Sequence, residues 1–104
     1  MNFDDALNAF LEHITEQKEA DRVARFPSLK KTVYTTEVGP KNIRVVTQDE
    51  DGGHRSVFCF IRRADGAVLK AAGWKAPAKH PRGTIFTDDP AQYGVGVYGA
   101  NYLR

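Results

Sequence analysis

A short apolar run followed by a tight-turn signal lies near the middle of the chain. Residues 57–61 (VFCFI) are aromatic, β-branched or otherwise apolar, a composition typical of a strand covered on both faces. Asp65-Gly66 follows, and it favours a two-residue type I′ turn because both central positions of that turn need positive φ. The sequence therefore predicts a central hairpin in which residues whose numbers sum to 131 pair, so that large side chains meet small ones. The expected pairs are Arg62 with Leu69, Phe60 with Ala71 and Phe58 with Gly73.

Two further strands are expected before this hairpin. Residues 32–38 (TVYTTEV) are rich in β-branched residues, Gly39-Pro40 interrupts the pattern, and residues 42–47 (NIRVVT) resume it. The short connections favour antiparallel neighbours. The sequence thus predicts a four-stranded antiparallel meander, with strands at about 32–38, 42–48, 54–63 and 67–74.

An amphipathic helix is expected to precede the sheet. Apolar residues recur at helical spacing from Phe3 to Ile14, Asn2 can cap the first turn, and the helix must end before Pro27. We expect an α+β fold in which this helix packs its apolar stripe on one face of the meander. The other face stays open unless the extended C-terminal segment covers it, and within that segment residues 84–86 (TIF) could form a short edge strand.

The length of 104 residues indicates one domain, spanning 1–104. The single cysteine, Cys59, lies inside the apolar run, where a buried thiol is expected instead of a disulfide or a nucleophile. Asp4 and Asp5 occupy positions where a secretory signal needs positive charge, and no apolar run approaches the roughly 20 residues of a membrane span. These features favour a cytoplasmic protein that does not insert into membranes.

No catalytic or metal-binding pattern is evident. His54 and Ser56 could face the same side of a strand, but neither elbow glycines nor an orienting acid accompany them. The three histidines and one cysteine lack the spacing of metal ligands. We therefore expect no enzymatic activity, no metal and no cofactor.

Charge is distributed unevenly along the chain. The net charge is +2, yet residues 54–83 hold seven bases and one acid, whereas residues 1–26 hold six acids and three bases. Prolines 77 and 81 stiffen the basic stretch, which lowers the entropy lost on docking. The candidate binding residues are Arg62, Arg63, Lys70, Trp74, Lys75, Lys79 and Arg82.

Trp74 can play either of two roles at the start of this basic stretch. It can anchor the segment onto the core, or it can offer a ring on which a base stacks. Cations beside an aromatic ring are the ingredients of a nucleic-acid surface, so we expect a small binding protein that engages nucleic acid without reading sequence. The alternative is an accessory protein that binds and modulates a host protein with an acidic surface.

The segment of residues 56–86 contains the run GAVLKAAGWKAPAK followed by HPRG. This segment resembles one found in small uncharacterised proteins of bacteriophages and related bacterial mobile elements, and it covers about a third of the chain. The resemblance implies a bacterial cytoplasmic setting and assigns no catalytic residues.

Overall fold

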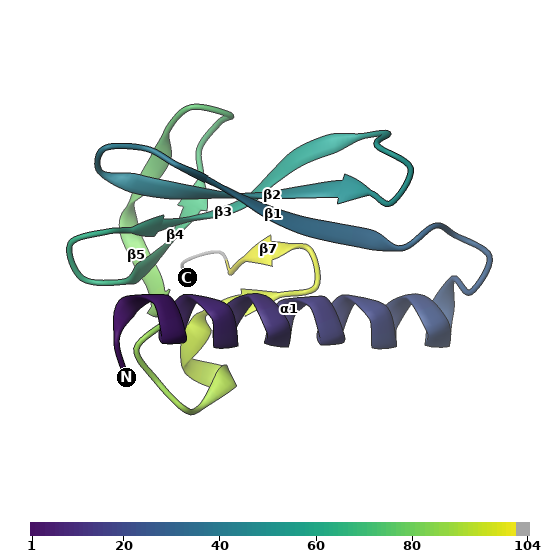
Figure 1. Cartoon of the computed structure of the whole chain (residues 1–104), viewed down its shortest axis with the longest axis horizontal. Helices are drawn as coiled ribbons and strands as arrows, with labels where there is room; N and C mark the ends of the chain where they lie inside the picture. Colours follow the sequence, from purple (N-terminus) through teal and green to yellow (C-terminus); the bar gives the residue numbers. More distant parts are fainter. Residues whose placement is uncertain (102–104) are drawn as a thin grey trace.

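A long helix lies across one face of a five-stranded antiparallel sheet (Figure 1). The structure is a computed structural model, and it describes residues 1–101. The sheet order is β1-β2-β3-β4-β5, and a two-stranded sheet, β6-β7, follows a short 3-10 helix. The elements are α1 (Phe3–Arg25), β1 (Thr32–Val38), β2 (Asn42–Asp49), β3 (Arg55–Arg62), β4 (Ala67–Ala71), β5 (Pro77–Thr84), η1 (Pro90–Tyr93), β6 (Val95–Gly96) and β7 (Gly99–Ala100). The α+β prediction is confirmed, but the main sheet has five strands where four were expected.

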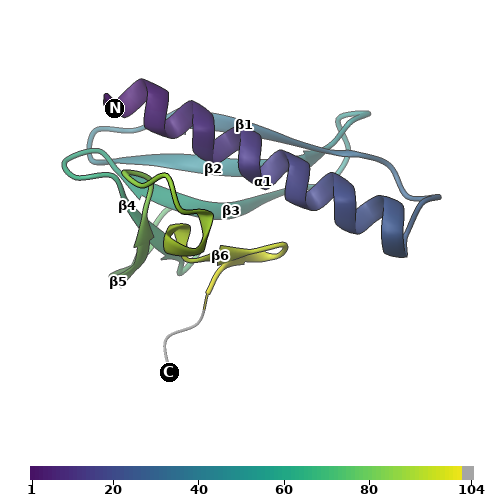
Figure 2. The same ribbon diagram turned by 90° about the horizontal axis from the view of Figure 1, so that it is seen from below.

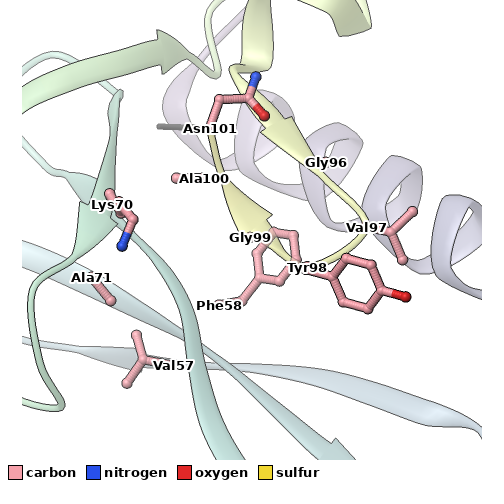
Figure 3. A pocket seen from close by; sticks show the side chains of 10 residues that line it. All are labelled: Val57, Phe58, Lys70, Ala71, Gly96, Val97, Tyr98, Gly99, Ala100 and Asn101. Atoms are coloured by element: carbon pink, nitrogen blue, oxygen red, sulfur yellow. The ribbon is translucent and has the colours of Figure 1, made fainter. Parts of the chain in front are cut away.

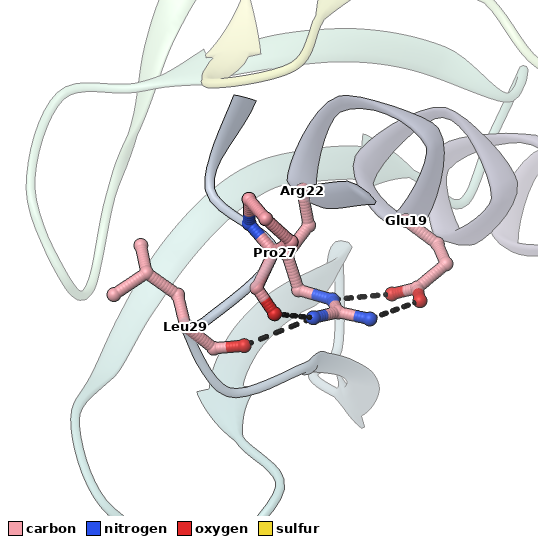
Figure 4. Close-up of polar contacts among 4 residues, drawn as sticks. All are labelled: Glu19, Arg22, Pro27 and Leu29. Atoms are coloured by element: carbon pink, nitrogen blue, oxygen red, sulfur yellow. Dashed lines mark hydrogen bonds and ion pairs between the residues drawn. The ribbon is translucent and has the colours of Figure 1, made fainter. Parts of the chain in front are cut away.

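Local signals fix both ends of α1. The Asn2 side chain accepts a hydrogen bond from the Asp5 backbone N–H at 2.8 Å, as expected for the capping residue. At the other end, the Arg22 guanidinium binds the Glu19 carboxylate and also donates to the carbonyl oxygens of Pro27 and Leu29, both at 3.0 Å (Figure 4). Arg22 therefore ties the end of the helix to the segment that leads into β1.

The core lies between α1 and the sheet. Phe10 and Ile14 of the helix are fully buried against the sheet residues Ile43, Val45, Cys59, Ile61 and Val68. Burial raises the pKa of the Cys59 thiol, so it stays protonated and behaves as a small apolar side chain. The expectation of a buried cysteine is confirmed.

The register of the central hairpin differs from the prediction. Phe60 pairs with Leu69 and Ile61 with Val68, so paired numbers sum to 129. The loop has four residues: the Gly66 N–H donates to the Arg62 carbonyl at 2.8 Å, and Gly66, with φ +73°, is the loop's left-handed residue. Asp65 is not left-handed, so a type I′ turn does not form. Because the error is two residues, every side chain keeps its expected face of the sheet.

The fifth strand, β5, lies in the basic stretch, where no strand was expected. It pairs with β4 through Ala67–Thr84, Val68–Gly83, Leu69–Pro81 and Ala71–Pro77, with irregular register between them. Proline lacks an N–H, and β5 tolerates Pro77 and Pro81 because it forms an edge of the sheet. The strand ends at Thr84, and Ile85 is buried in the core, so residues 84–86 do not form the separate edge strand considered above.

The C-terminal elements pack on the same side of the sheet as α1 (Figures 1 and 2). The ring of Tyr93 in η1 contacts that of Phe10 edge-on, with centroids 5.0 Å apart. β3 and β4 pair at only two positions, and β7 contacts both strands beyond the paired part. Up to residue 101, the C-terminal segment therefore does not cover the opposite face of the sheet, which we call the open face.

Candidate functional site

Trp74 lies over the open face of the sheet. It belongs to the connection between β4 and β5, and its ring contacts two arginines from the sheet. The guanidinium carbon of Arg44 is 4.9 Å from the ring centroid, and that of Arg55 is 5.3 Å away. Both distances lie within the range of cation–π contacts, and these contacts hold the ring while 40% of Trp74 remains exposed. Trp74 therefore anchors its loop onto the sheet, while part of the residue stays exposed to solvent.

Strand alternation places Arg44 beneath this ring. Ile43 and Val45 are buried in the core below α1, so Arg44 between them projects from the open face. The β1–β2 register then sets Glu37 opposite Arg44. Glu37 Oε1 accepts from Arg44 Nη1 at 2.8 Å, and Oε2 accepts from Arg55 Nη2 at 3.2 Å. These hydrogen bonds, with that of Arg44 the stronger influence, lower the pKa of the Glu37 carboxyl and keep it ionised.

A cleft of about 340 Å³ adjoins Arg44 on this face. Buried Phe60 lines it together with Arg44, and Lys41 and Lys75 stand at its sides. Both lysines are exposed, and within residues 1–101 their ammonium groups make no ion pair. They are therefore available to an anionic ligand.

A second cleft, of about 530 Å³, continues the basic surface past Lys41 and Pro40. It is lined by Arg62 and Arg63, two of the residues expected from the sequence. Arg62 makes two hydrogen bonds to the Asp65 carboxylate, at 3.0 and 2.8 Å, which are the main reason that the pKa of Asp65 falls to about 2. The Arg63 guanidinium donates to the carbonyl of Gly39 at 2.9 Å. Both arginines hold turns in place while remaining at the surface.

We call this set of side chains the open-face cluster. It has six bases and two acids, so its net charge is +4, and Trp74 stands among them. Sequence reasoning missed five members. A turn centred on Pro40 and Lys41, instead of Gly39 and Pro40, gives the register that pairs Glu37 with Arg44, and it is the signal that could have found these two. The members are Glu37, Lys41, Arg44, Arg55, Arg62, Arg63, Asp65, Trp74 and Lys75.

Three of the seven expected residues do not join the cluster. Lys70 lines a separate cleft of about 370 Å³ between the sheet and the β6–β7 hairpin (Figure 3). Arg82 donates from Nε to the Asn101 carbonyl at 2.8 Å and from Nη1 to the carbonyl of His80. Lys79 is exposed on β5 and lines neither open-face cleft. The basic stretch is therefore divided among several surfaces.

The structure also places the residues considered for catalysis. The hydroxyl groups of Ser56 and Thr47 lie 2.8 Å apart. Within the described part of the chain, Ser56 therefore has Thr47, and not His54, as its side-chain partner. Residues 1–101 contain no group of three His, Cys, Asp or Glu side chains placed to hold a metal ion. Over the same residues, no helix combines the length and apolar character needed to cross a membrane.

Comparison with known proteins identifies a family. A model described as a family of unknown function, DUF7717, matches residues 2–95. The chain belongs to DUF7717. The match to DUF7717 includes the whole open-face cluster, together with α1, the five-stranded sheet and η1. No curated protein and no solved structure matches the chain.

Proposed function

We propose that the open-face cluster binds nucleic acid, preferring single strands and reading no particular sequence. The observation that carries this proposal is partly exposed Trp74, whose ring is held beside two guanidinium groups on a sheet face that none of the described helices covers. Stacking of a base on an aromatic ring suits single strands, whose bases have free faces, and it tolerates any base.

Within the cluster, Trp74 provides a surface for stacking and the basic side chains provide positive charge. Arg44 and Arg55 are already bound to Glu37, so their positions are set before a ligand arrives and less entropy is lost on binding. Lys41 and Lys75 keep their ammonium groups available and stand beside the cleft, where phosphates can approach. A strand would therefore stack a base on Trp74 and run its backbone past these two lysines.

Trp74 provides the test because it is the only tryptophan of the chain. The protein is titrated with a mixed-sequence single strand and with the corresponding duplex, at two salt concentrations, while tryptophan fluorescence is followed. We expect quenching by the single strand that weakens with salt, with a log-log slope of roughly −0.7 for each neutralised phosphate.

A matched pair of variants separates this cluster from general attraction to a basic protein. Lys41→Ala/Lys75→Ala should weaken binding and make the slope shallower by roughly 0.7 for each phosphate that the variant no longer neutralises. Lys18→Ala/Lys79→Ala is the control, because it removes the same charge away from the cluster: Lys18 contacts Tyr98 on the covered side of the sheet, and Lys79 lines neither open-face cleft. Equal losses of affinity in both variants would contradict the proposal.

The competing proposal is an accessory protein that engages an acidic host protein through the same cluster. An acidic protein surface and a phosphate chain attract the same cations, so the two proposals differ in partner and not in residues. No quenching by either nucleic acid at low salt would reject nucleic acid. Stoichiometric binding of one host protein, lost in the Lys41→Ala/Lys75→Ala variant, would then favour the modulator.

A further inference from the structure

The two edge strands of the main sheet differ in how strongly they resist pairing with a further strand. β5 contains Pro77 and Pro81 and pairs irregularly with β4, and both features discourage another strand from adding there. β1 forms the other edge, has neither proline nor lysine, and pairs with β2 in seven consecutive positions without a register shift. A long, regular edge of this kind is a template for a further strand.

The hydrogen bonds at the two ends of β1 show which of its backbone groups face outward. The Gly39 N–H donates to Asn42, and the Lys31 carbonyl accepts from Glu50, so odd-numbered residues bond toward β2. Because antiparallel pairing alternates and the register is regular, even-numbered residues direct their N–H and C=O groups away from the sheet. The outward-facing residues are Thr32, Tyr34, Thr36 and Val38.

We propose that β1 pairs antiparallel with β1 of a second copy of this chain, joining two sheets into one. The favoured register pairs residues whose numbers sum to 70, with Thr35 facing Thr35 of the partner subunit across a two-fold axis. In this register all four outward-facing residues of each strand are paired. The eight outward-facing N–H groups of the two strands then all donate to carbonyl groups of the other strand. Shifting the register by two residues in either direction leaves outward groups of one strand end unpaired.

Side chains support the same pairing. The register sets Val33, which is 44% exposed, opposite Glu37, and Thr35 opposite itself, so no like charges face each other. It also sets Val38 of one copy opposite Thr32 of the other, at the start of the strand. Leu29, 59% exposed, precedes that end of β1, so the pairing offers cover to Val38, itself 68% exposed.

Engineered cysteines test the register directly. Thr35→Cys places a thiol on the two-fold axis, at a non-hydrogen-bonded pair whose Cα atoms are roughly 4.5 Å apart, within the range that a disulfide spans. Thr36→Cys is the matched control, because residue 36 and its copy are roughly 8 Å apart in this register, beyond disulfide reach. The native Cys59 is fully buried and does not compete. We expect the Thr35→Cys protein to form a disulfide-linked dimer under mild oxidation, and the Thr36→Cys protein to remain mostly uncrosslinked.

Sedimentation equilibrium measures the same association without crosslinking. The mass of the unmodified protein should rise from that of one chain toward twice that value as concentration increases. Thr36→Pro removes an outward-facing N–H while leaving the bonds to β2 in place, so it should abolish this rise, whereas Thr36→Val should keep it.

Three results would overturn the proposal. One is a single-chain mass at all concentrations, and another is a dimer that persists in the Thr36→Pro protein. The third is crosslinking of Thr36→Cys as fast as that of Thr35→Cys, which would place the contact elsewhere. If the Thr36→Pro protein fails to fold, the cysteine pair alone decides, and neither cysteine alters the backbone groups of β1.

Discussion

Replacing Gly83 with alanine should strongly destabilise the fold. Gly83 lies in β5 where the chain crosses η1, and a Cβ there would stand 2.3 Å from the Gln92 carbonyl oxygen and 2.4 Å from the Tyr93 carbonyl. Ordinary contacts begin near 3.5 Å, so the two segments must separate by about 1 Å. All the atoms that clash belong to the backbone, so no side chain can rotate aside.

The size of the effect follows from this geometry. Overpacking costs about 1–3 kcal/mol, and we expect about 3 kcal/mol here because η1 must move, which also disrupts the packing of Tyr93 on Phe10. For a domain of this size, that loss of stability lowers Tm by roughly 12 °C or more. Gly73→Ala is the matched control, since a Cβ at Gly73 meets nothing within 4 Å. It should be neutral or stabilising by up to about 1 kcal/mol.

Urea denaturation followed by Trp74 fluorescence measures both variants, with thermal unfolding by circular dichroism as a second probe. The expected order of stability is Gly73→Ala, then the unmodified protein, then Gly83→Ala far below. A Gly83→Ala protein within about 0.5 kcal/mol of the unmodified one, a span typical of ordinary surface substitutions, would refute the reasoning. It would mean that η1 does not press on β5 in solution.

Three further predictions concern the core and the turn. Phe10→Ala should cost about 3–5 kcal/mol in urea denaturation, because it opens a cavity at the centre of the core, and a loss below about 1 kcal/mol would contradict the packing. The Cys59 thiol should resist a thiol reagent such as DTNB in the folded protein and react at once in urea; rapid reaction of the folded protein would contradict its burial. The pKa of Asp65 is lowered from 3.8 to about 2, chiefly by the hydrogen bonds from Arg62. The pair therefore stabilises the fold fully at pH values above 3.8, and this contribution is lost as the pH falls toward 2. Acid titrations of stability should be flatter over that interval for Asp65→Asn, and parallel curves would show that the pair contributes nothing.

The elements with strong local signals were predicted well from sequence. Asn2 and Pro27 bound the helix because a cap and a proline act within one turn, and the Gly39-Pro40 break marked the end of β1. β5 was missed because Pro77 and Pro81 are typical of loops, and only the three-dimensional edge position makes them acceptable in a strand. The hairpin register was wrong because Asp-Gly also fits a four-residue loop with one left-handed glycine.

The candidate site was predicted only in part, for a different reason. Trp74 and Lys75, which are neighbours in sequence, both belong to the open-face cluster, whereas Lys70 and Arg82 lie beside the C-terminal elements. A count of charge along the chain contains no information about faces, and it therefore could not separate these groups. Arg44 entered the site because of strand alternation and register, which a charge count ignores.

The distribution of cover over the sheet explains why the open-face cluster, the proposed binding surface, arises where it does. α1, η1 and the β6–β7 hairpin all pack on one face, where they bury Phe10, Ile14 and Tyr93. Among residues 1–101, no helix packs on the open face, and the exposed positions next to Phe60 have to be compatible with water. Arginines meet this requirement because their stems cover apolar surface while the guanidinium groups stay hydrated or bind Glu37. The same arrangement leaves a fixed, positively charged platform around Trp74, so the demands of solvating one face of the sheet also produce the charge on which the proposed binding of an anionic partner rests.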